Sequence, residues 1–248
     1  MLTKNQEKLI RSLALRKNRK KSGLFVAEGL KLVTDLISAG LAVQNIFLTE
    51  GSSEAFAVTE QTIELSIQEM KSISFLETPS PVLALFEQPV RLSEFQSDTG
   101  LILLLDRIQD PGNMGTLLRS ALWYGVEHIG FVKGCVDAFN PKVVQASMGA
   151  LAHLQCVERS AEEWVEWSAS NGRRLLVADM DGTPAAEMNW TSKDILVLGN
   201  EGQGCDVAFK AVGNKVTLPG NTAKMESLNV AISGATLLYA YATASSEL

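Results

Sequence analysis

The chain has 248 residues, 46% of them hydrophobic and 20% charged, which is the composition of an ordinary globular protein and allows one large domain or two small ones. No apolar run approaches the roughly 20 residues of a membrane span, and the three cysteines, odd in number and without C-x-x-C spacing, disfavour disulfides and zinc. With a net charge of −6 and an N-terminus that lacks a secretory signal, the sequence predicts a cytoplasmic protein with reduced thiols and no metal centre.

The first element along the chain is a predicted helix over residues 2–15, whose apolar side chains recur on one face. Nine Lys and Arg against two acidic residues within 1–31 give a local balance of +7, so the remaining chain carries −13. Such asymmetry is typical of a basic contact surface for nucleic acid on an acidic body, although a solvated helical face would look the same. The candidate RNA contacts are five basic residues: Arg16, Lys17, Arg19, Lys20 and Lys21.

The first half of the chain alternates between helices and strands, which is the pattern of an α/β domain. Predicted strands cover residues 23–29, 43–50 and 82–87, and predicted helices cover residues 2–15, 28–40 and 66–75. Residues 88–100 are mostly polar and contain a proline and a glycine, so they separate the two halves. We therefore expect one domain over residues 1–88, a linker over 89–99 and a second domain over 100–248.

The second half repeats the alternation with more apolar strands, as expected for a central parallel sheet. Predicted strands cover residues 101–106, 128–132, 151–157, 173–180 and 194–200, and predicted helices cover residues 114–125, 161–172 and 227–244. Trp164 and Trp167, three residues apart, indicate a buried or half-buried helix face rather than a platform for stacking bases. His128 and His153 each stand alone in an apolar run, and we interpret them as core or edge residues rather than metal ligands.

Three turns marked by glycine or proline follow apolar strands in the second half, at residues 110–115, 199–204 and 218–227. Turns at the carboxyl ends of neighbouring parallel strands can converge on one crevice that binds a ligand. Each turn also has a plain structural interpretation, in which Glu201 caps the next helix and Ser227 is the N-cap of the last one. The standard phosphate motifs are absent, because no Gly-Lys-Ser/Thr tripeptide occurs and the first turn lacks the third glycine of a dinucleotide fingerprint.

In order and spacing, N-x-G-x-x-x-R (113–119), L-G-N-E-G-x-G (198–204) and L-P…E-S-L-N-V-A (218–231) closely resemble the three motifs of the SpoU (TrmH) family, within the SPOUT superfamily. Members of that family are S-adenosylmethionine-dependent RNA ribose 2′-O-methyltransferases. The first half, where a basic segment leads into F-x-x-E-G, resembles the small ribosomal-protein-like RNA-binding domain of many members. One departure is the segment GNTAKM (220–225), which is one residue longer than the family usually has between its proline and its glutamate.

The resemblance implies an α/β fold class: a small N-terminal α/β RNA-binding domain followed by a C-terminal parallel-sheet α/β domain with a deep trefoil knot. It also implies roles for individual residues. Three residues would contact S-adenosyl-L-methionine: Gly199, Leu218 and Leu228. Five would form the catalytic site: Arg119, Asn113, Glu201, Ser227 and Asn229. In the family the arginine commonly reaches the partner subunit's pocket, which implies a homodimer, and no metal is implied.

Arginine suits this chemistry because it stays protonated and can stabilise the negative charge that develops on a ribose oxygen while gripping the adjacent phosphate. The sequence thus predicts an RNA 2′-O-ribose methyltransferase, with rRNA preferred over tRNA because the two-domain layout is similar to that of rRNA-modifying members. One alternative is a catalytically silent RNA-binding protein on the same knotted scaffold, which the five intact catalytic residues disfavour. The other is a dinucleotide-dependent enzyme on a Rossmann-type sheet, which the missing third glycine disfavours.

Overall fold

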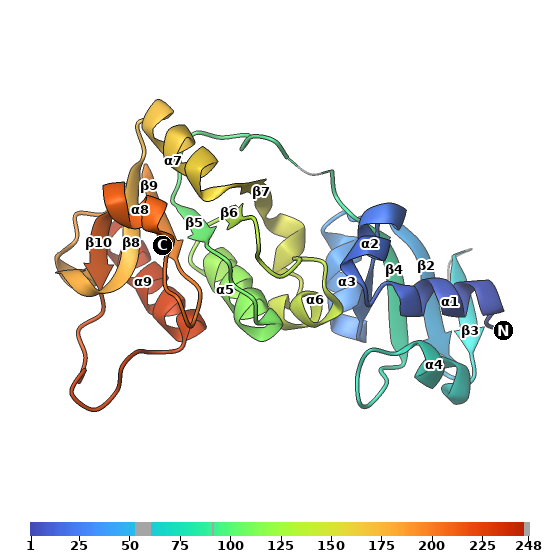
Figure 1. Ribbon diagram of the computed structural model, residues 1–248. Coiled ribbons are helices and arrows are strands. Elements are labelled where there is room, and N and C mark those ends of the chain that lie inside the picture. The colour runs from blue at the N-terminus through green and yellow to red at the C-terminus, as the bar shows by residue number, and fades with distance from the viewer. Residues whose placement is uncertain (53–60, 91, 246–248) are drawn as a thin grey trace. The chain divides into compact units, whose positions relative to one another are not determined.

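The computed structural model describes residues 1–52, 61–90 and 92–245, and the chain divides into two compact units (Figure 1). Unit 1 comprises residues 1–90 and 137–152, and unit 2 comprises residues 91–136 and 153–248. We had expected residues 137–152 to belong with the second half throughout. They group with unit 1 because α6 packs against β1 and because the Phe139 and Phe25 rings lie 5.1 Å apart.

Unit 1 is built on a four-stranded sheet with the strand order β1-β4-β2-β3. Its strands are β1 (Leu24–Glu28), β2 (Val43–Thr49), β3 (Thr62–Leu65) and β4 (Val82–Glu87). Its helices are α1 (Lys4–Ser12), α2 (Arg16–Ser22), α3 (Leu30–Ser38), α4 (Ile67–Ile73) and α6 (Pro141–Ser147). β4 runs antiparallel to β1 and β2, whereas β2 and β3 are parallel. The expected α/β alternation is confirmed, while β3 and the separate basic helix α2 were not anticipated.

Local interactions explain how the first helices and the F-x-x-E-G segment fold. α1 begins at a capping box between Thr3 and Gln6, and α2 ends at Gly23, whose φ of 69° lies in the left-handed region that glycine tolerates. The buried Glu28 carboxylate accepts hydrogen bonds from the Ser74 hydroxyl and the backbone N–H groups of Phe75 and Ser80. That glutamate therefore fastens the loop between α4 and β4, since a buried carboxylate must be hydrogen-bonded.

Unit 2 is built on a six-stranded sheet, β10-β8-β9-β5-β6-β7, in which every pair of neighbours is parallel, as expected. Its strands are β5 (Ile102–Leu105), β6 (His128–Val132), β7 (Gln155–Arg159), β8 (Arg174–Pro184), β9 (Asp194–Leu198) and β10 (Asn214–Thr217). Its helices are α5 (Pro111–Trp123), α7 (Ala161–Ser170), α8 (Val207–Val212) and α9 (Val230–Ser245), with a short 3-10 turn, η3 (Ala185–Glu187). Another 3-10 turn, η2 (Ala150–His153), occupies the first part of the strand predicted over 151–157.

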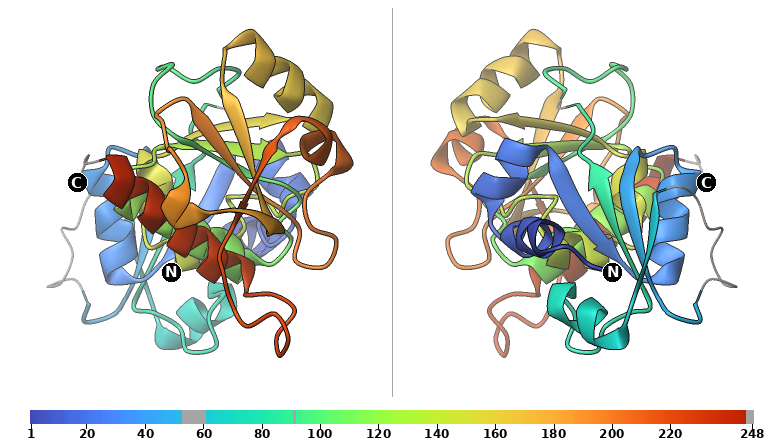
Figure 2. Two further views of the ribbon diagram at one scale, coloured as in Figure 1. Left: turned by 90° about the vertical axis from the view of Figure 1, so that its left-hand side faces the viewer. Right: turned by 90° about the vertical axis from the view of Figure 1, so that its right-hand side faces the viewer.

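Helices cover both faces of this sheet. α9 lies along α5 (Figure 2, left), and the two backbones come close because Gly234 has no side chain: a Cβ there would meet Leu117 at 2.3 Å. On the other face, Trp164 of α7 is fully buried and donates a hydrogen bond to the Phe131 carbonyl, whereas Trp167 is half-buried. The two tryptophans thus mark a buried or half-buried helix face, as predicted.

The remaining sequence predictions concern the histidines, the linker, membrane spans and metal sites. His128 is buried against the Phe95 ring, whereas His153 is exposed. Residues 92–99, expected as part of a linker, are attached to unit 2, where Leu92 pairs with Val157 beside β7 and Glu94 accepts from Trp167. Within residues 1–52, 61–90 and 92–245, no helix is long and apolar enough to cross a membrane, and no group of three His, Cys, Asp or Glu could hold a metal ion.

Candidate functional site

The three glycine- or proline-marked turns meet at one place in unit 2. They follow β5, β9 and β10, which are parallel strands whose carboxyl ends lie at the same edge of the sheet. The Asn113 side chain joins all three turns: its Nδ2 donates to Glu201 Oε1 over 2.8 Å, and its Oδ1 accepts from Asn229 Nδ2 over 3.0 Å. We call Glu201, Asn113 and Asn229 the Asn113 cluster.

The first turn places Asn113 by capping α5. The Asp110 carboxylate accepts a hydrogen bond of 2.7 Å from the Asn113 N–H, and Pro111 occupies the first turn, where its missing N–H costs nothing. The helix therefore begins three residues earlier than the predicted start at 114, and Asn113 lies within its first turn. A side chain there faces the neighbouring strand ends, which is how Asn113 reaches Glu201.

The second turn, residues 199–206, is held by its own backbone and by Asn200. Gly199 is obligatory because a Cβ there would lie 2.2 Å from the backbone nitrogen of Cys205. The Asn200 side chain accepts from the N–H groups of Gly202 and Gln203, at 3.0 and 3.1 Å. Glu201 does not cap the next helix, since Asp206 caps α8, and its carboxylate is left exposed at the tip of the turn.

The third turn connects β10 to α9 and includes the GNTAKM segment, every residue of which is exposed. The N-cap predicted at Ser227 is wrong: Asn229 Oδ1 accepts from the N–H groups of Ala231 and Ile232, so Asn229 caps the helix. Asn229 uses its oxygen for this cap and its nitrogen for Asn113, whereas Ser227 stays exposed beside the pocket.

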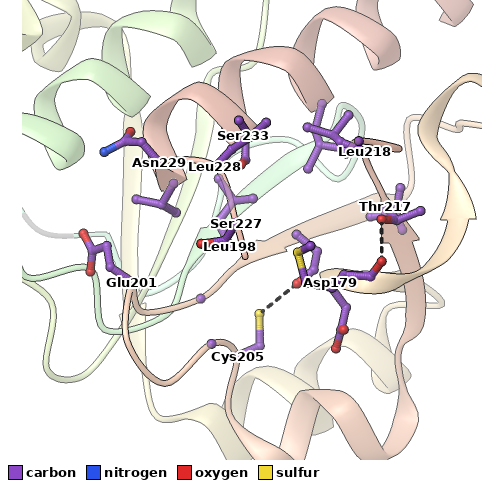
Figure 3. A pocket seen from close by; sticks show the side chains of 18 of the residues that line it. Asp179, Leu198, Glu201, Cys205, Thr217, Leu218, Ser227, Leu228, Asn229 and Ser233 are labelled. Carbon is purple, nitrogen blue, oxygen red and sulfur yellow. Dashed lines mark hydrogen bonds between the residues drawn. The ribbon is translucent and has the colours of Figure 1, made fainter. Parts of the chain in front are cut away.

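A pocket of about 710 Å³ opens between these turns (Figure 3). Six of the predicted site residues line it: Gly199, Leu218, Leu228, Glu201, Ser227 and Asn229. Glu201 and Asn229 lie toward one side of the pocket, and Asp179, Thr217 and Leu218 lie toward the other. Its volume falls within the roughly 300–1,000 Å³ of sites that hold small molecules and cofactors, and its wall combines leucines with polar side chains and turn backbone.

Arg119, by contrast, does not line this pocket. Its side chain is exposed on α5 and forms no hydrogen bond or ion pair with any part of the chain that the structure describes. α5 and α9, which pack against each other, also carry large exposed hydrophobic side chains: Trp123 (79% exposed), Ile232 (56%) and Tyr239 (54%). The structure thus brings together four of the five predicted catalytic residues and leaves the arginine on an apolar outer face of the same unit.

The basic residues of unit 1 divide into two groups. Four of the five predicted RNA contacts are exposed along α2: Arg16, Lys17, Lys20 and Lys21. Arg19 is only 1% exposed, and its Nε and Nη2 both donate to Asp137 Oδ2 over 2.7 Å. Its Nη1 donates to the carbonyls of Leu13 and Ala14. The assignment of Arg19 to an exposed RNA surface is therefore corrected, because its guanidinium is used inside unit 1.

Several residues of the site were not anticipated from the sequence. Asp179, Lys210 and the buried Cys205 line the pocket, and burial raises the pKa of the Cys205 thiol to about 12, so the thiol stays protonated. Arg107 contacts the second turn. None of them carries a spacing signal of its own, although a charged pair directly after an apolar strand, as at Asp106 and Arg107, could have indicated a strand-end contact.

Comparison with known proteins matches both units of the chain to described families. Residues 100–239 match the SpoU rRNA Methylase family, and residues 4–84 match the MRM3-like substrate binding domain. The 23S rRNA (guanosine(2553)-2'-O)-methyltransferase RlmP of Bacillus subtilis is 29% identical over 240 residues, which cover 95% of this chain and 96% of that protein. The human mitochondrial rRNA methyltransferase 3 is 32% identical over 196 residues, or 71% of this chain, which spans only 45% of the human protein.

Solved structures are similar over nearly the whole chain. A putative RNA methyltransferase of the TrmH family from Porphyromonas gingivalis superposes with a TM-score of 0.86 and 36% identity, covering 97% of this chain and 98% of that one. An AdoMet-bound rRNA methyltransferase from Sinorhizobium meliloti superposes with a TM-score of 0.86 and 27% identity, covering 97% and 95%.

Proposed function

Because the chain belongs to the SpoU rRNA methylase family, we propose that it transfers a methyl group from S-adenosyl-L-methionine to the 2′-hydroxyl of a ribose in ribosomal RNA, in the cytoplasm. The observation that carries the proposal is the Asn113 cluster beside the 710 Å³ pocket, where side chains from all three motifs meet. The names of the relatives support rRNA as the substrate class. The trefoil knot remains part of the proposal. So does the division into functional segments 1–88, 89–99 and 100–248, in which residues 137–152 belong to the methyltransferase segment although they pack with unit 1.

The pocket fits the cofactor. Leu218 and Leu228 offer apolar surface for a nucleoside and a methionine chain, and the turn at Gly199 brings backbone polar groups to the wall. When bound there, S-adenosyl-L-methionine supplies a methyl group carried on a positively charged sulfur. Methyl transfer of this kind does not require a metal ion, because positioning and charge stabilisation can supply much of the rate acceleration.

The side chains of the Asn113 cluster orient the ribose. The amides of Asn113 and Asn229 present hydrogen-bonding groups at the pocket edge, and Glu201 fixes the Asn113 amide through its 2.8 Å bond. Ser227 offers a hydroxyl from the third turn. The oxygen of the ribose hydroxyl would bond to the methyl carbon as the carbon–sulfur bond breaks, which leaves neutral S-adenosylhomocysteine, and the hydroxyl proton would pass to solvent. Arg119 would stabilise the charge on that oxygen and hold the neighbouring phosphate.

We place Arg119 in the pocket of a second copy of the chain. It lies outside the pocket of its own chain, on an outer face with exposed Trp123, Ile232 and Tyr239, and exposed aromatic side chains favour association. The resulting homodimer is tested by mixing two inactive variants, Arg119→Ala and the pocket variant Leu218→Arg. One site of each heterodimer then combines an intact arginine with an intact pocket, so activity should return to a fraction of the wild-type value. A mixture that stays inactive although heterodimers form would contradict action across the interface.

The direct test is transfer of a labelled methyl group from S-adenosyl-L-methionine to purified rRNA, followed by mapping of 2′-O-methyl ribose. Equal amounts of tRNA serve as the competing substrate, because tRNA remains the alternative substrate. Transfer to rRNA that exceeds transfer to tRNA supports the proposal, and the reverse preference would replace rRNA by tRNA. RNA binding without any transfer to either RNA would favour the catalytically silent scaffold.

A further inference from the structure

Arg107, directly after β5, has a backbone that non-glycine residues rarely adopt. Its φ is 56°, in the left-handed region. The side chain forms a two-pronged pair with Asp106: Nε donates to Oδ1 over 2.7 Å and Nη2 to Oδ2 over 3.0 Å. The Asp106 side chain is fully buried, and this hydrogen bond raises the pKa of the Arg107 guanidinium, which therefore stays charged. A strained conformation that is held this firmly suggests a function for the residue.

Arg107 and Asp106 together hold the 199–206 turn through contacts with four of its residues. The Arg107 carbonyl accepts from Asn200 Nδ2 over 3.0 Å, near the start of the turn. Its guanidinium donates longer hydrogen bonds to Gln203 Oε1 (3.4 Å) and to the Gly204 carbonyl (3.5 Å). Near the end, Asp106 Oδ2 accepts from the Asp206 N–H over 2.6 Å.

Most residues of this turn also face the pocket. Gly199, Asn200, Glu201, Gly204 and Cys205 all line it, and Glu201 bonds to Asn113 from the exposed tip. Gly134, with a φ of 110°, leaves room for the aliphatic part of the Arg107 side chain, because a Cβ at Gly134 would lie only 3.2 Å from Arg107 Cγ.

We propose that Arg107 is a positioning residue for methyl transfer: it fixes the 199–206 turn so that Gly199 forms the cofactor pocket and Glu201 meets Asn113. It acts through the turn and does not line the pocket itself. A guanidinium is required, because its planar fork can bond Asp106 with two N–H groups and still reach Gln203 and Gly204, which a single ammonium cannot do. The inference rests on the proposed function, since it assigns the pocket to S-adenosyl-L-methionine.

Two substitutions separate the contributions of Arg107. Arg107→Gly removes the side chain, but glycine adopts the left-handed backbone freely and so keeps the carbonyl bond to Asn200. Arg107→Lys keeps the charge beside Asp106 and loses the fork. The matched control is Arg174→Lys: Arg174 pairs with the fully buried Asp194 through Nε and Nη2, at 2.9 and 2.8 Å, where β8 and β9 begin, at the opposite edge of the sheet.

The measurements are the Kd of S-adenosylhomocysteine by calorimetry, kcat and the KM for rRNA, and the thermal midpoint of the full-length protein. We expect both Arg107 variants to bind S-adenosylhomocysteine at least tenfold more weakly and to have a lower kcat, with the KM for rRNA unchanged. Arg174→Lys should lower the thermal midpoint without changing the Kd.

The inference is overturned if both Arg107 variants keep wild-type Kd and kcat. It is also overturned if Arg174→Lys weakens binding as much as Arg107→Lys does at an equal loss of stability, because the effect would then be general destabilisation. A wild-type protein that fails to bind either S-adenosyl-L-methionine or S-adenosylhomocysteine would instead contradict the proposed function itself.

Discussion

Arg19 and Lys20 are adjacent basic residues of α2 for which the structure predicts opposite phenotypes. Arg19 and Asp137 form an ion pair at 2.7 Å with side chains only 2% and 7% exposed. Replacing Arg19 by alanine leaves a buried carboxylate without its partner, which costs about 3–5 kcal/mol. For a domain the size of unit 1, that loss lowers the thermal midpoint by on the order of 10 °C or more. Lys20 is exposed, so Lys20→Ala should change stability by no more than about 0.5 kcal/mol.

RNA binding should show the reverse pattern. If Lys20 contacts a phosphate, Lys20→Ala should reduce the slope of log affinity against log salt concentration by about 0.7–0.9. The variant for Arg19 must keep unit 1 folded, and Arg19→Met combined with Asp137→Leu does so by replacing the buried pair with apolar side chains, a change that is often neutral. This double variant should bind RNA with the wild-type salt slope.

The assays are thermal unfolding followed by circular dichroism and fluorescence anisotropy of labelled rRNA fragments at several salt concentrations. The reasoning is refuted if Arg19→Ala unfolds at the wild-type temperature, because the pair would then contribute nothing. It is also refuted if the double variant loses as much salt dependence as Lys20→Ala, since Arg19 would then contact RNA despite its burial. Lys142, exposed on α6 of the same unit, provides a comparison for general charge effects through Lys142→Ala.

Three more outcomes are expected. Arg119→Ala should lower the rate of methyl transfer by on the order of a hundredfold or more with cofactor affinity nearly unchanged, as for loss of one donor to a developing oxyanion, and Arg119→Lys should restore activity only partly; full activity of Arg119→Ala would disprove its role. Gly199→Ala should abolish binding of S-adenosyl-L-methionine in calorimetry, because its Cβ would lie 2.2 Å from the Cys205 nitrogen, whereas Gly202→Ala, whose Cβ would meet nothing nearer than 3.7 Å, should bind normally. Burial, and after it the charge of Arg173, lowers the pKa of His128, so as the pH drops the unfolded chain takes up the proton before the folded protein does. The free energy of unfolding should therefore decrease as the pH drops below about 6.5. Urea unfolding between pH 8 and 5 should show a smaller decrease for His128→Asn, and a decrease equal to that of the wild type would contradict this assignment.

The sequence predicted the strands better than the turns between them. Residues 102–105 and 195–198 are apolar at every position, which is typical of central parallel strands, and the structure has both strands within a residue or two of the predicted bounds. β3 was missed because TIEL is short and only its last residue is buried, so it lacks an apolar run. α6 was missed for a related reason, since its seven residues are too few to show a helical period.

Contacts between residues far apart in sequence were beyond prediction from periodicity. Arg19 was predicted as exposed because its neighbours in RKNRKK are, and only the fold brings Asp137, 118 residues away, against it. Ser227 was predicted as the N-cap since serine favours that position, but the helix begins at Val230 and Asn229 is the residue directly before it. A shift of two residues in the N-cap position was enough to give this role to Asn229 and to leave Ser227 exposed.

The residues of the three motifs divide by exposure into those that form the turns and those available to a substrate. Gly199 has no room for a side chain, and Asn200 uses its amide on the backbone of its own turn and on the carbonyl of Arg107, so both are needed for the fold of the turn. Glu201 and Arg119 are exposed, so their charges stay solvated. An accessible charged side chain beside a pocket, or on an apolar outer face, contributes little to the fold of its own chain. For this physical reason we assign the chemistry to these two residues rather than to the glycines between them.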